Sequence, residues 1–375
     1  MKKNISATLI AALLALIPAT AGAENYVTGG FEAFGHVVTG IGFEKFSNNP
    51  VTEWTNDGTF PGVIGSYIPN VAAGTLPSPG QDNFMFYVDD AELDIVKTFG
   101  KNIGIRADLE FGRLSSGSFF DFNMQQAYLT ANIPMGNGLE FTIGRFWGPA
   151  GFEGNDAFDN EIISWSILTR ANLYPYMYTG IKARYEFNDN LALSLVVSND
   201  NVSDTTATMD DVPSFTAHLR INWGEEDHEN TVGITPFFGP ESGDNTHFSY
   251  GMDVDWYVYL TESLSIGGEG LFRRDNGFGG PNSEYAAGIF EIYYDLTEAV
   301  YGVIRYSYCR QFDVSNGVLN LTGDKQQIHE ASLGGGWWFA DNAGLKAEAR
   351  FDYIAPDDNA NQWNVGASLA FMYGF

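Results

Sequence analysis

Hydrophobic and polar residues alternate along most of this chain, and the pattern is clearest at its C-terminal end. From Trp363 to Phe375 every odd position is apolar, and the even positions are small or polar except for Met372. A period of two is the pattern of a β-strand with one apolar face. Comparable segments recur along the chain and predict about sixteen strands, at 26–45, 84–99, 103–113, 122–134, 139–147, 176–187, 191–199, 214–223, 231–239, 247–260, 264–275, 284–296, 300–313, 328–339, 344–354 and 363–375.

The strand count has two weak points. Pro236 lies inside one segment, and several glycines interrupt the first one. Proline removes a backbone donor and glycine weakens a strand interior, so fourteen or eighteen strands also fit the pattern.

The connections between these segments alternate in length. Short ones lie at 100–102, 135–138, 188–190, 261–263, 297–299 and 341–343, and four of the six carry the Asn, Asp or Gly that tight turns favour. The connection 224–230 is somewhat longer, and the other connections include 47–83, 148–175, 200–213, 276–283, 316–327 and 355–362. Short periplasmic turns opposite long extracellular loops are typical of a transmembrane barrel. We therefore predict an all-β fold, a transmembrane antiparallel up-and-down β-barrel with periplasmic termini.

The N-terminal segment has the features of an export signal. Lys2 and Lys3 precede an apolar run at 5–17, and a small-x-small site ends at Ala23. We predict that residues 1–23 are removed and that 24–375 forms one barrel domain. No later stretch approaches the roughly 18 apolar residues of a transmembrane helix. A secreted β-sandwich or β-solenoid is the alternative, but it does not predict the alternation of loop lengths.

Composition narrows the function classes. Aromatic residues make up 15% of the chain and glycine (43) outnumbers lysine plus arginine (19), which suits transmembrane strands. The single Cys309 cannot form an internal disulfide. A net charge of −28 argues against nucleic-acid binding. The five histidines lie in no catalytic or metal-ligand motif, and no glycine-rich phosphate loop is present, so we expect no enzyme activity, no cofactor and no metal site.

Alternation also assigns the two faces of each strand. The residues that share the polar parity should face the lumen, where a barrel of sixteen strands leaves an aqueous channel. Eight of them are basic: Arg106, Lys182, Arg184, Arg220, Arg273, Arg305, Lys346 and Arg350. Fifteen are acidic: Asp90, Glu92, Asp94, Asp108, Glu110, Glu140, Glu186, Asp253, Asp255, Glu269, Glu291, Asp295, Glu330, Glu348 and Asp352. A packed salt-bridge interior or a plugged lumen is the alternative to an open pore.

The connection 148–175 would be the third extracellular loop. It carries Glu153, Asp156, Asp159 and Glu161 and is moderately apolar. By analogy with general porins, we expect it to fold into the lumen and form a constriction, where rings of charge set the ion preference. A surface lid or a contact between subunits is the alternative.

Three motifs resemble the OmpL-like β-barrel porin family: MQQAYLTANIP at 124–134, FTIGRFWGPAGFEG at 141–154 and YTGIKARYEFNDNLALSLVVSND at 178–200. The resemblance implies an outer-membrane channel for small solutes. The terminal strand with Tyr373 and Phe375 is similar to the insertion signal of bacterial outer-membrane barrels, which the barrel-assembly machinery reads. The other expected partners are outer-membrane lipid, lipopolysaccharide, and small solutes and ions, with a homotrimer as the candidate assembly.

Two functions follow from these observations. The first is an outer-membrane porin, a passive diffusion channel for small hydrophilic solutes and ions that weakly prefers cations, because inward carboxylates outnumber inward cations. The second is a structural or adhesive outer-membrane protein with a narrow or plugged lumen, whose loop 47–83 engages a partner.

Overall fold

The structure is a computed structural model of the 375-residue chain. It describes residues 31–46, 82–111, 122–154, 158–170, 173, 176–199, 212–225, 228–240, 247–277, 283–313, 326–357 and 361–375. The predicted signal peptide 1–23, most of the loop 47–83 and the loop residue Asp156 lie outside the described residues, as does the side chain of Asp90.

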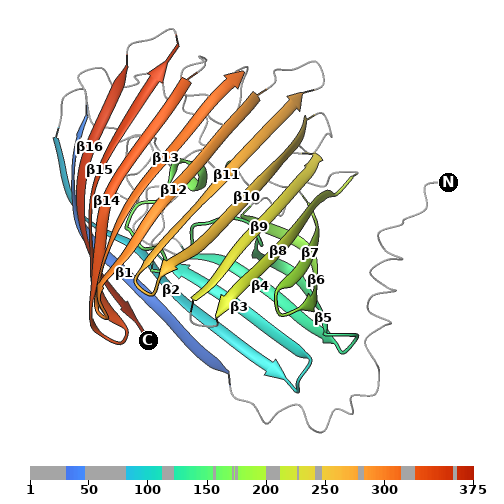
Figure 1. Ribbon diagram of the computed structural model, residues 1–375. Helices are drawn as coiled ribbons and strands as arrows, with labels where there is room; N and C mark the ends of the chain where they lie inside the picture. The colour runs from blue at the N-terminus through green and yellow to red at the C-terminus, as the bar shows by residue number, and fades with distance from the viewer. Residues whose placement is uncertain are drawn as a thin grey trace.

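Sixteen antiparallel strands form a closed barrel in which each strand pairs with its neighbours in sequence and β1 closes against β16 (Figure 1). This confirms the predicted fold. The strands are β1 (Glu32–Phe46), β2 (Asp82–Phe99), β3 (Ile103–Phe111), β4 (Phe122–Ile133), β5 (Leu139–Trp147), β6 (Met177–Asn188), β7 (Leu191–Ser198), β8 (Ser214–Glu225), β9 (His228–Pro240), β10 (His247–Thr261), β11 (Leu264–Gly277), β12 (Ser283–Thr297), β13 (Val300–Asp313), β14 (Gln326–Ala340), β15 (Ala343–Pro356) and β16 (Gln362–Gly374).

The predicted strand around Pro236 is present, and its pairing with one neighbouring strand is interrupted at the proline. β9 pairs with β10 through Pro236, opposite Met252. Its register with β8 passes from Phe237 directly to Ile234, so the ladder is interrupted on that side. A residue without a backbone N–H cannot complete a ladder on both sides. Within the interruption, Thr235 Oγ1 lies 2.8 Å from His218 Nδ1, and this side-chain contact bridges the two strands.

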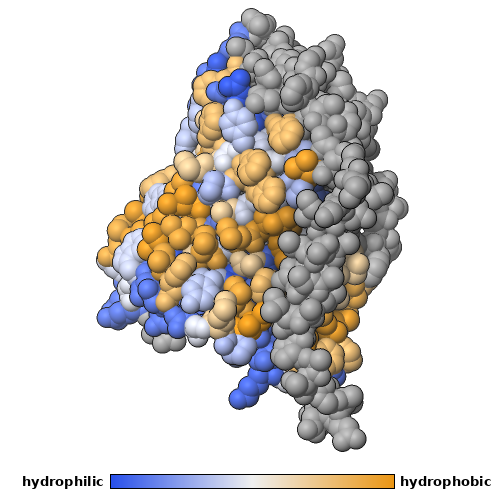
Figure 2. All heavy atoms as spheres, turned by 90° about the vertical axis from the view of Figure 1, so that its right-hand side faces the viewer, coloured by the Kyte–Doolittle hydropathy of each residue, from blue (hydrophilic) through white to orange (hydrophobic). Residues whose placement is uncertain are grey.

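The two faces of the wall alternate as the sequence predicts. In β16, Trp363, Leu369 and Phe371 are exposed, whereas Asn364 and Met372 are buried. Exposed large apolar side chains recur at the outward positions of nearly every strand. Figure 2 shows one side of the barrel, where apolar side chains gather across the middle of the visible wall and hydrophilic ones lie nearer its edges. An outward apolar band of this kind is the surface that a barrel presents to lipid.

The short connections all lie at one end of the barrel, which we call the short-turn end. The turn before β3 and the turn between β14 and β15 lie there, together with the described termini, Phe31 and Phe375. Phe375 exchanges two backbone hydrogen bonds with Gly35 of β1, at 2.9 and 3.1 Å. This end corresponds to the predicted periplasmic side.

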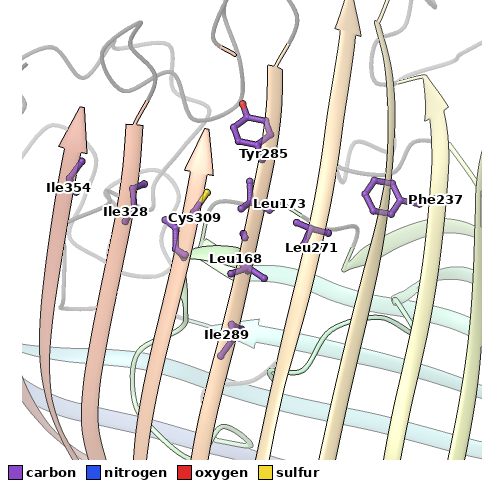
Figure 3. Close-up of a cluster of buried hydrophobic side chains, with 11 residues drawn as sticks. Leu168, Leu173, Phe237, Leu271, Tyr285, Ile289, Cys309, Ile328 and Ile354 are labelled. Carbon is purple, nitrogen blue, oxygen red and sulfur yellow. The ribbon is translucent and has the colours of Figure 1, made fainter. Parts of the chain in front are cut away.

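The inner face carries apolar clusters as well as charges. The largest cluster joins Leu168 and Leu173, from the segment between β5 and β6, to side chains of β9 and β11–β15. Figure 3 shows Leu168 and Leu173 beside Leu271, Ile289 and Cys309 on neighbouring strands. The segment between β5 and β6 is therefore fixed against the inside of the wall.

That segment contains one short helix, α2 (Ile167–Arg170), which contacts β12 and β13. In Figure 1 it is the small green helix inside the ring of strands. Within the described residues, no helix has both the length and the apolar content needed to cross a membrane.

Candidate pore and its infolded loop

The segment 148–175, which we call the inner loop, donates backbone hydrogen bonds to carboxylates of the wall. Phe152 N–H donates to Glu269 Oε2 at 2.8 Å, and Ser164 N–H donates to Glu348 Oε2 at 2.7 Å. Ile167 N–H donates to Glu330 Oε2 at 2.6 Å. These carboxylates are buried and lie on β11, β14 and β15. Irregular backbone inside a barrel needs such partners, because its N–H groups have no ladder to complete.

Cationic side chains of the same wall bind the carbonyl oxygens of the inner loop. Arg305 Nη2 donates to Ser164 O at 2.7 Å, and Arg350 Nη1 donates to Trp165 O at 3.0 Å. Lys346 Nζ donates to Phe158 O at 2.9 Å and also to Asn160 O. The charged residues of β13–β15 thus supply both the donors and the acceptors that the inner loop requires.

One buried ion pair fixes the start of the inner loop. Arg305 Nη1 donates to Glu153 Oε1 at 2.6 Å, and both side chains are only 3% exposed. The second oxygen of Glu153 accepts from Ser166 Oγ at 2.6 Å, and Ser166 N–H donates to Oε1 at 2.8 Å. Arg350 pairs with Glu330, and with Asp352 at 2.6 Å. Two of the eight predicted inward basic residues, Arg305 and Arg350, are therefore neutralised by carboxylates of the loop and the adjacent wall.

The inner loop reaches the short-turn end of the barrel. The ring of Phe158 stacks on His36 of β1 with centroids 5.3 Å apart, and it meets Trp338 of β14 at 5.7 Å. Ile162 packs with Tyr301 and Val303 in a separate apolar cluster. Because His36 and Trp338 lie near the short-turn ends of their strands, the inner loop extends inside the barrel as far as that end.

The electrostatics of the inner loop follow from its burial. Burial raises the pKa of the Glu161 carboxyl above its ordinary value, and the positive charges of Lys346 and Arg305 oppose that rise. Tyr301 Oη donates to the backbone oxygen of Glu161 at 2.9 Å. Asp159 is exposed.

The wall formed by β6–β8 is more open than the wall that carries the inner loop. Arg184 pairs with Glu186 at 2.8 Å, with side chains 41% and 51% exposed. Arg220 is exposed, and its Nε lies 3.3 Å from Thr231 Oγ1. The ammonium of Lys182 lies 5.3 Å from the centroid of Phe146. These cations differ in this respect from Arg273, Arg305, Lys346 and Arg350, which are buried.

The comparisons with known proteins agree with this geometry. A model of the family described as "Putative beta-barrel porin-2, OmpL-like" matches residues 63–375. The chain belongs to this family of porins. The match confirms the resemblance inferred from the sequence motifs, and it supports an outer-membrane channel. No curated protein sequence matches the chain significantly.

Solved structures show where the porin's fold recurs. It is similar to the outer membrane channel DcaP of Acinetobacter baumannii, at 12% identity and a TM-score of 0.64, over 92% of this chain and 97% of that one. It is also similar to an anion-selective porin from Comamonas acidovorans, at 10% identity and a TM-score of 0.61, over 92% of this chain and 99% of that one. The similarity to OmpT of Vibrio cholerae in its trimer form has 13% identity and a TM-score of 0.53, over 92% of this chain and 99% of that one. At these identities the similarity shows the fold alone.

Carboxylates of an acidic cluster on β2 and β3 of the porin are paired with neighbouring side chains. Carboxylate oxygens of Glu92, Asp94 and Asp108 lie within 4.8 Å of one another. Arg106 pairs with Asp108 at 2.6 Å and with Asp94 at 3.3 Å, and Gln126 also donates to Asp108. Like charges this close are stabilised by the neighbouring guanidinium, so no metal is needed to explain the cluster.

Sequence reasoning missed several residues that hold the porin's inner loop. Glu269 and Glu330 were expected only to line the pore, whereas they accept hydrogen bonds from the loop backbone. Ser164, His36 and Trp338 carried no charge pattern that could identify them. The sequence shows only that each has inward parity or lies in the apolar part of the loop. That does not distinguish a residue that holds the loop from one that merely lines the lumen.

Proposed function

We propose that this porin is a passive diffusion channel for small hydrophilic solutes and ions and that it weakly prefers cations. The observation that carries the proposal is a closed sixteen-strand wall whose inner face is rich in charges. A barrel of about eight strands is filled by its own side chains, whereas sixteen strands enclose more space than they can fill. The inner loop narrows that space along β11–β15 and leaves the β6–β8 wall facing it.

The proposed cation preference rests on the charges of this chain. Four inward cations, Arg273, Arg305, Lys346 and Arg350, already bind the inner loop or neighbouring carboxylates. Among the described residues, Asp255 and Glu291 each have a buried side-chain oxygen without a hydrogen-bond partner. Such carboxylates require water or counter-ions. An acidic excess concentrates cations within about 8–10 Å of the wall near physiological salt.

Reversal potentials under a KCl gradient test this preference. We expect the unmodified porin in a planar bilayer to favour potassium modestly, with a preference that fades as salt rises because the wall charges become screened. Neutralising Asp156, Asp159 and Glu161 together should reduce the preference if these loop charges line the constriction. A clear preference for chloride in the unmodified porin would contradict the proposal.

We also propose that the porin is exported and that processing occurs after Ala23. The motif at 21–23 supports this position. N-terminal sequencing of the protein purified from outer membranes should begin at Glu24. An intact N-terminus, or recovery of the protein only from the soluble periplasm, would overturn it.

The terminal strand is proposed to act in assembly through Tyr373 and Phe375. Both side chains are exposed on the outer face, where an insertion machine in the membrane could reach them. Deleting Phe375 should sharply reduce the yield of folded barrel in cells while changing the stability of the folded fraction much less. Heat-modifiable mobility on gels measures the folded fraction. A yield equal to that of the unmodified porin would remove the support for a recognition role.

The remaining partners are proposals of the same kind. Outer-membrane lipid would cover the apolar band, and acidic extracellular loops would share divalent cations with lipopolysaccharide. A homotrimer is the proposed assembly, since a trimer form is known for OmpT of Vibrio cholerae. Chemical cross-linking of intact outer membranes tests it, and a product limited to monomers would reject the trimer.

The structural or adhesive alternative has one observation in its favour. The inner loop places Ile162, Ile163, Ile167, Leu168 and Leu173 in buried positions inside the barrel, so it occupies part of the lumen. Single-channel conductance separates the two functions. Stepwise current increases in planar bilayers support the channel, and their absence with a correctly folded barrel supports the plugged alternative.

A further inference from the structure

A cavity of about 790 Å³ lies between the inner loop and the short-turn end of the wall. Phe158 and Asp159 of the inner loop form one side of it, and Trp338 and Asp341 of the β14–β15 hairpin form another. Its volume falls within the range of roughly 300–1,000 Å³ that small-molecule sites occupy. It lies at the short-turn end, so a solute leaving the lumen there would pass it.

Two aromatic rings form a fixed corner in this cavity. The planes of Phe158 and Trp338 are inclined by 64° with centroids 5.7 Å apart. Phe158 is held in place, because its ring stacks at 28° on His36, which also lines the cavity, and because Lys346 binds its backbone oxygen at 2.9 Å. Ring faces that are held in place in this way attract cations, and the attraction grows when the site excludes water.

The charges around the corner are predominantly negative. Asp94, Asp159 and Asp341 line the cavity, and Arg106 is the one cation among its lining residues. Arg106 is already ion-paired with Asp94 at 3.3 Å and with Asp108 at 2.6 Å. Its charge is therefore largely compensated, and the carboxylates of Asp159 and Asp341 repel an anionic solute while attracting a cationic one.

We propose that this cavity is a transient binding subsite for small organic cations, in which an ammonium group with an apolar substituent lies against Phe158 and Trp338 near Asp159 and Asp341. The proposal rests on the proposed channel function and names a solute class for the same lumen. A neutral polyhydroxy solute would also contact the rings, but it would gain little from the excess of carboxylates. That difference is what the experiment measures.

The probe is benzyltrimethylammonium chloride, added to the short-turn side of the full-length mature porin in a planar bilayer that carries a KCl current. We expect a saturable, concentration-dependent block of the current. Benzyl alcohol and benzoate, which share the ring but are neutral or anionic, should block far less. Replacing Trp338 with alanine should weaken the block about threefold or more, the range of a cation–π contact, whereas W338F should retain most of it.

Two matched control variants are available in the same molecule. Trp337 is the neighbour of Trp338 but is 51% exposed on the outer face, so W337A should leave the block unchanged. Asp341 and Asp189 both lie in short turns, and only Asp341 lines the cavity. D341N should therefore weaken the block and D189N should not.

Two outcomes would overturn the inference in the bilayer: equal block by benzyl alcohol, or a block that W338A and D341N leave intact. Saturation-transfer NMR of the same probe with the folded porin in micelles, against protein-free micelles, gives a readout that needs no conductance. Probe binding that D341N weakens, in a protein that carries no current, supports the subsite and rejects the channel. A conducting porin with no such binding rejects the subsite alone.

Discussion

Replacing Arg305 with methionine is expected to lower the free energy of unfolding by about 3–5 kcal/mol, because the substitution leaves the carboxylate of Glu153 buried without its ion-pair partner. The pair lies 2.6 Å apart, and both side chains are 3% exposed. The same substitution also removes the donor to the backbone oxygen of Ser164. The inner loop would lose its ion pair and this hydrogen bond to β13, so the single-channel conductance should rise as the start of the loop becomes less firmly held against the wall.

The matched control is Arg310 on the same strand. It pairs with Asp357 at 3.0 Å, but the side chains are 19% and 40% exposed. R310M should therefore cost only about 0–1 kcal/mol. Urea-induced unfolding in lipid vesicles, followed by tryptophan fluorescence, compares the two variants. Equal costs would mean that water reaches Glu153, and a partial recovery in the double variant E153Q/R305M would show that the unpaired charge causes the loss.

Replacing Val254 with arginine is expected to cost about 2–4 kcal/mol, the penalty for a charge on the lipid face near the middle of the bilayer. Val254 lies in the middle of β10, where it is opposite Ile234 and Gly270. Its neighbour Asp255 has the opposite parity, so D255R should be milder because it places the charge on the lumen side of the wall and not in lipid. The same unfolding measurement compares them, and equal damage from both would mean that the face assignment is wrong or the lumen is dry.

The strands of this porin were predictable because each one carries its signal locally. A period of two is set by the pleat, so Trp363, Leu369 and Phe371 reveal their common face without knowledge of any partner strand. Consecutive pairing then follows from the short turns. Even the doubtful segment with Pro236 formed a strand, since a ladder can be interrupted on one side while the other continues.

The contacts of the inner loop were not predictable in the same way. Ser164 and Glu348 are 184 residues apart, and Phe152 and Glu269 are 117 apart. No local pattern encodes which carboxylate accepts from which backbone N–H. The sequence showed only that the loop is apolar enough to be buried against something, and that several charges point inward. The pairing of Glu153 with Arg305 depends on how deeply the loop enters, which only the assembled barrel determines.

The seam between β1 and β16 has a consequence for how the molecule is made. Every other strand pair joins neighbours in sequence, whereas this seam aligns His36 with Gly374 and Lys45 with Val365. Until the last strand arrives, the first one presents a row of unsatisfied backbone groups, which hydrocarbon does not tolerate. An open sheet therefore cannot insert into the bilayer one strand at a time. The last strand must be synthesised before the barrel can close, and until then the free edge must be paired or shielded by another protein.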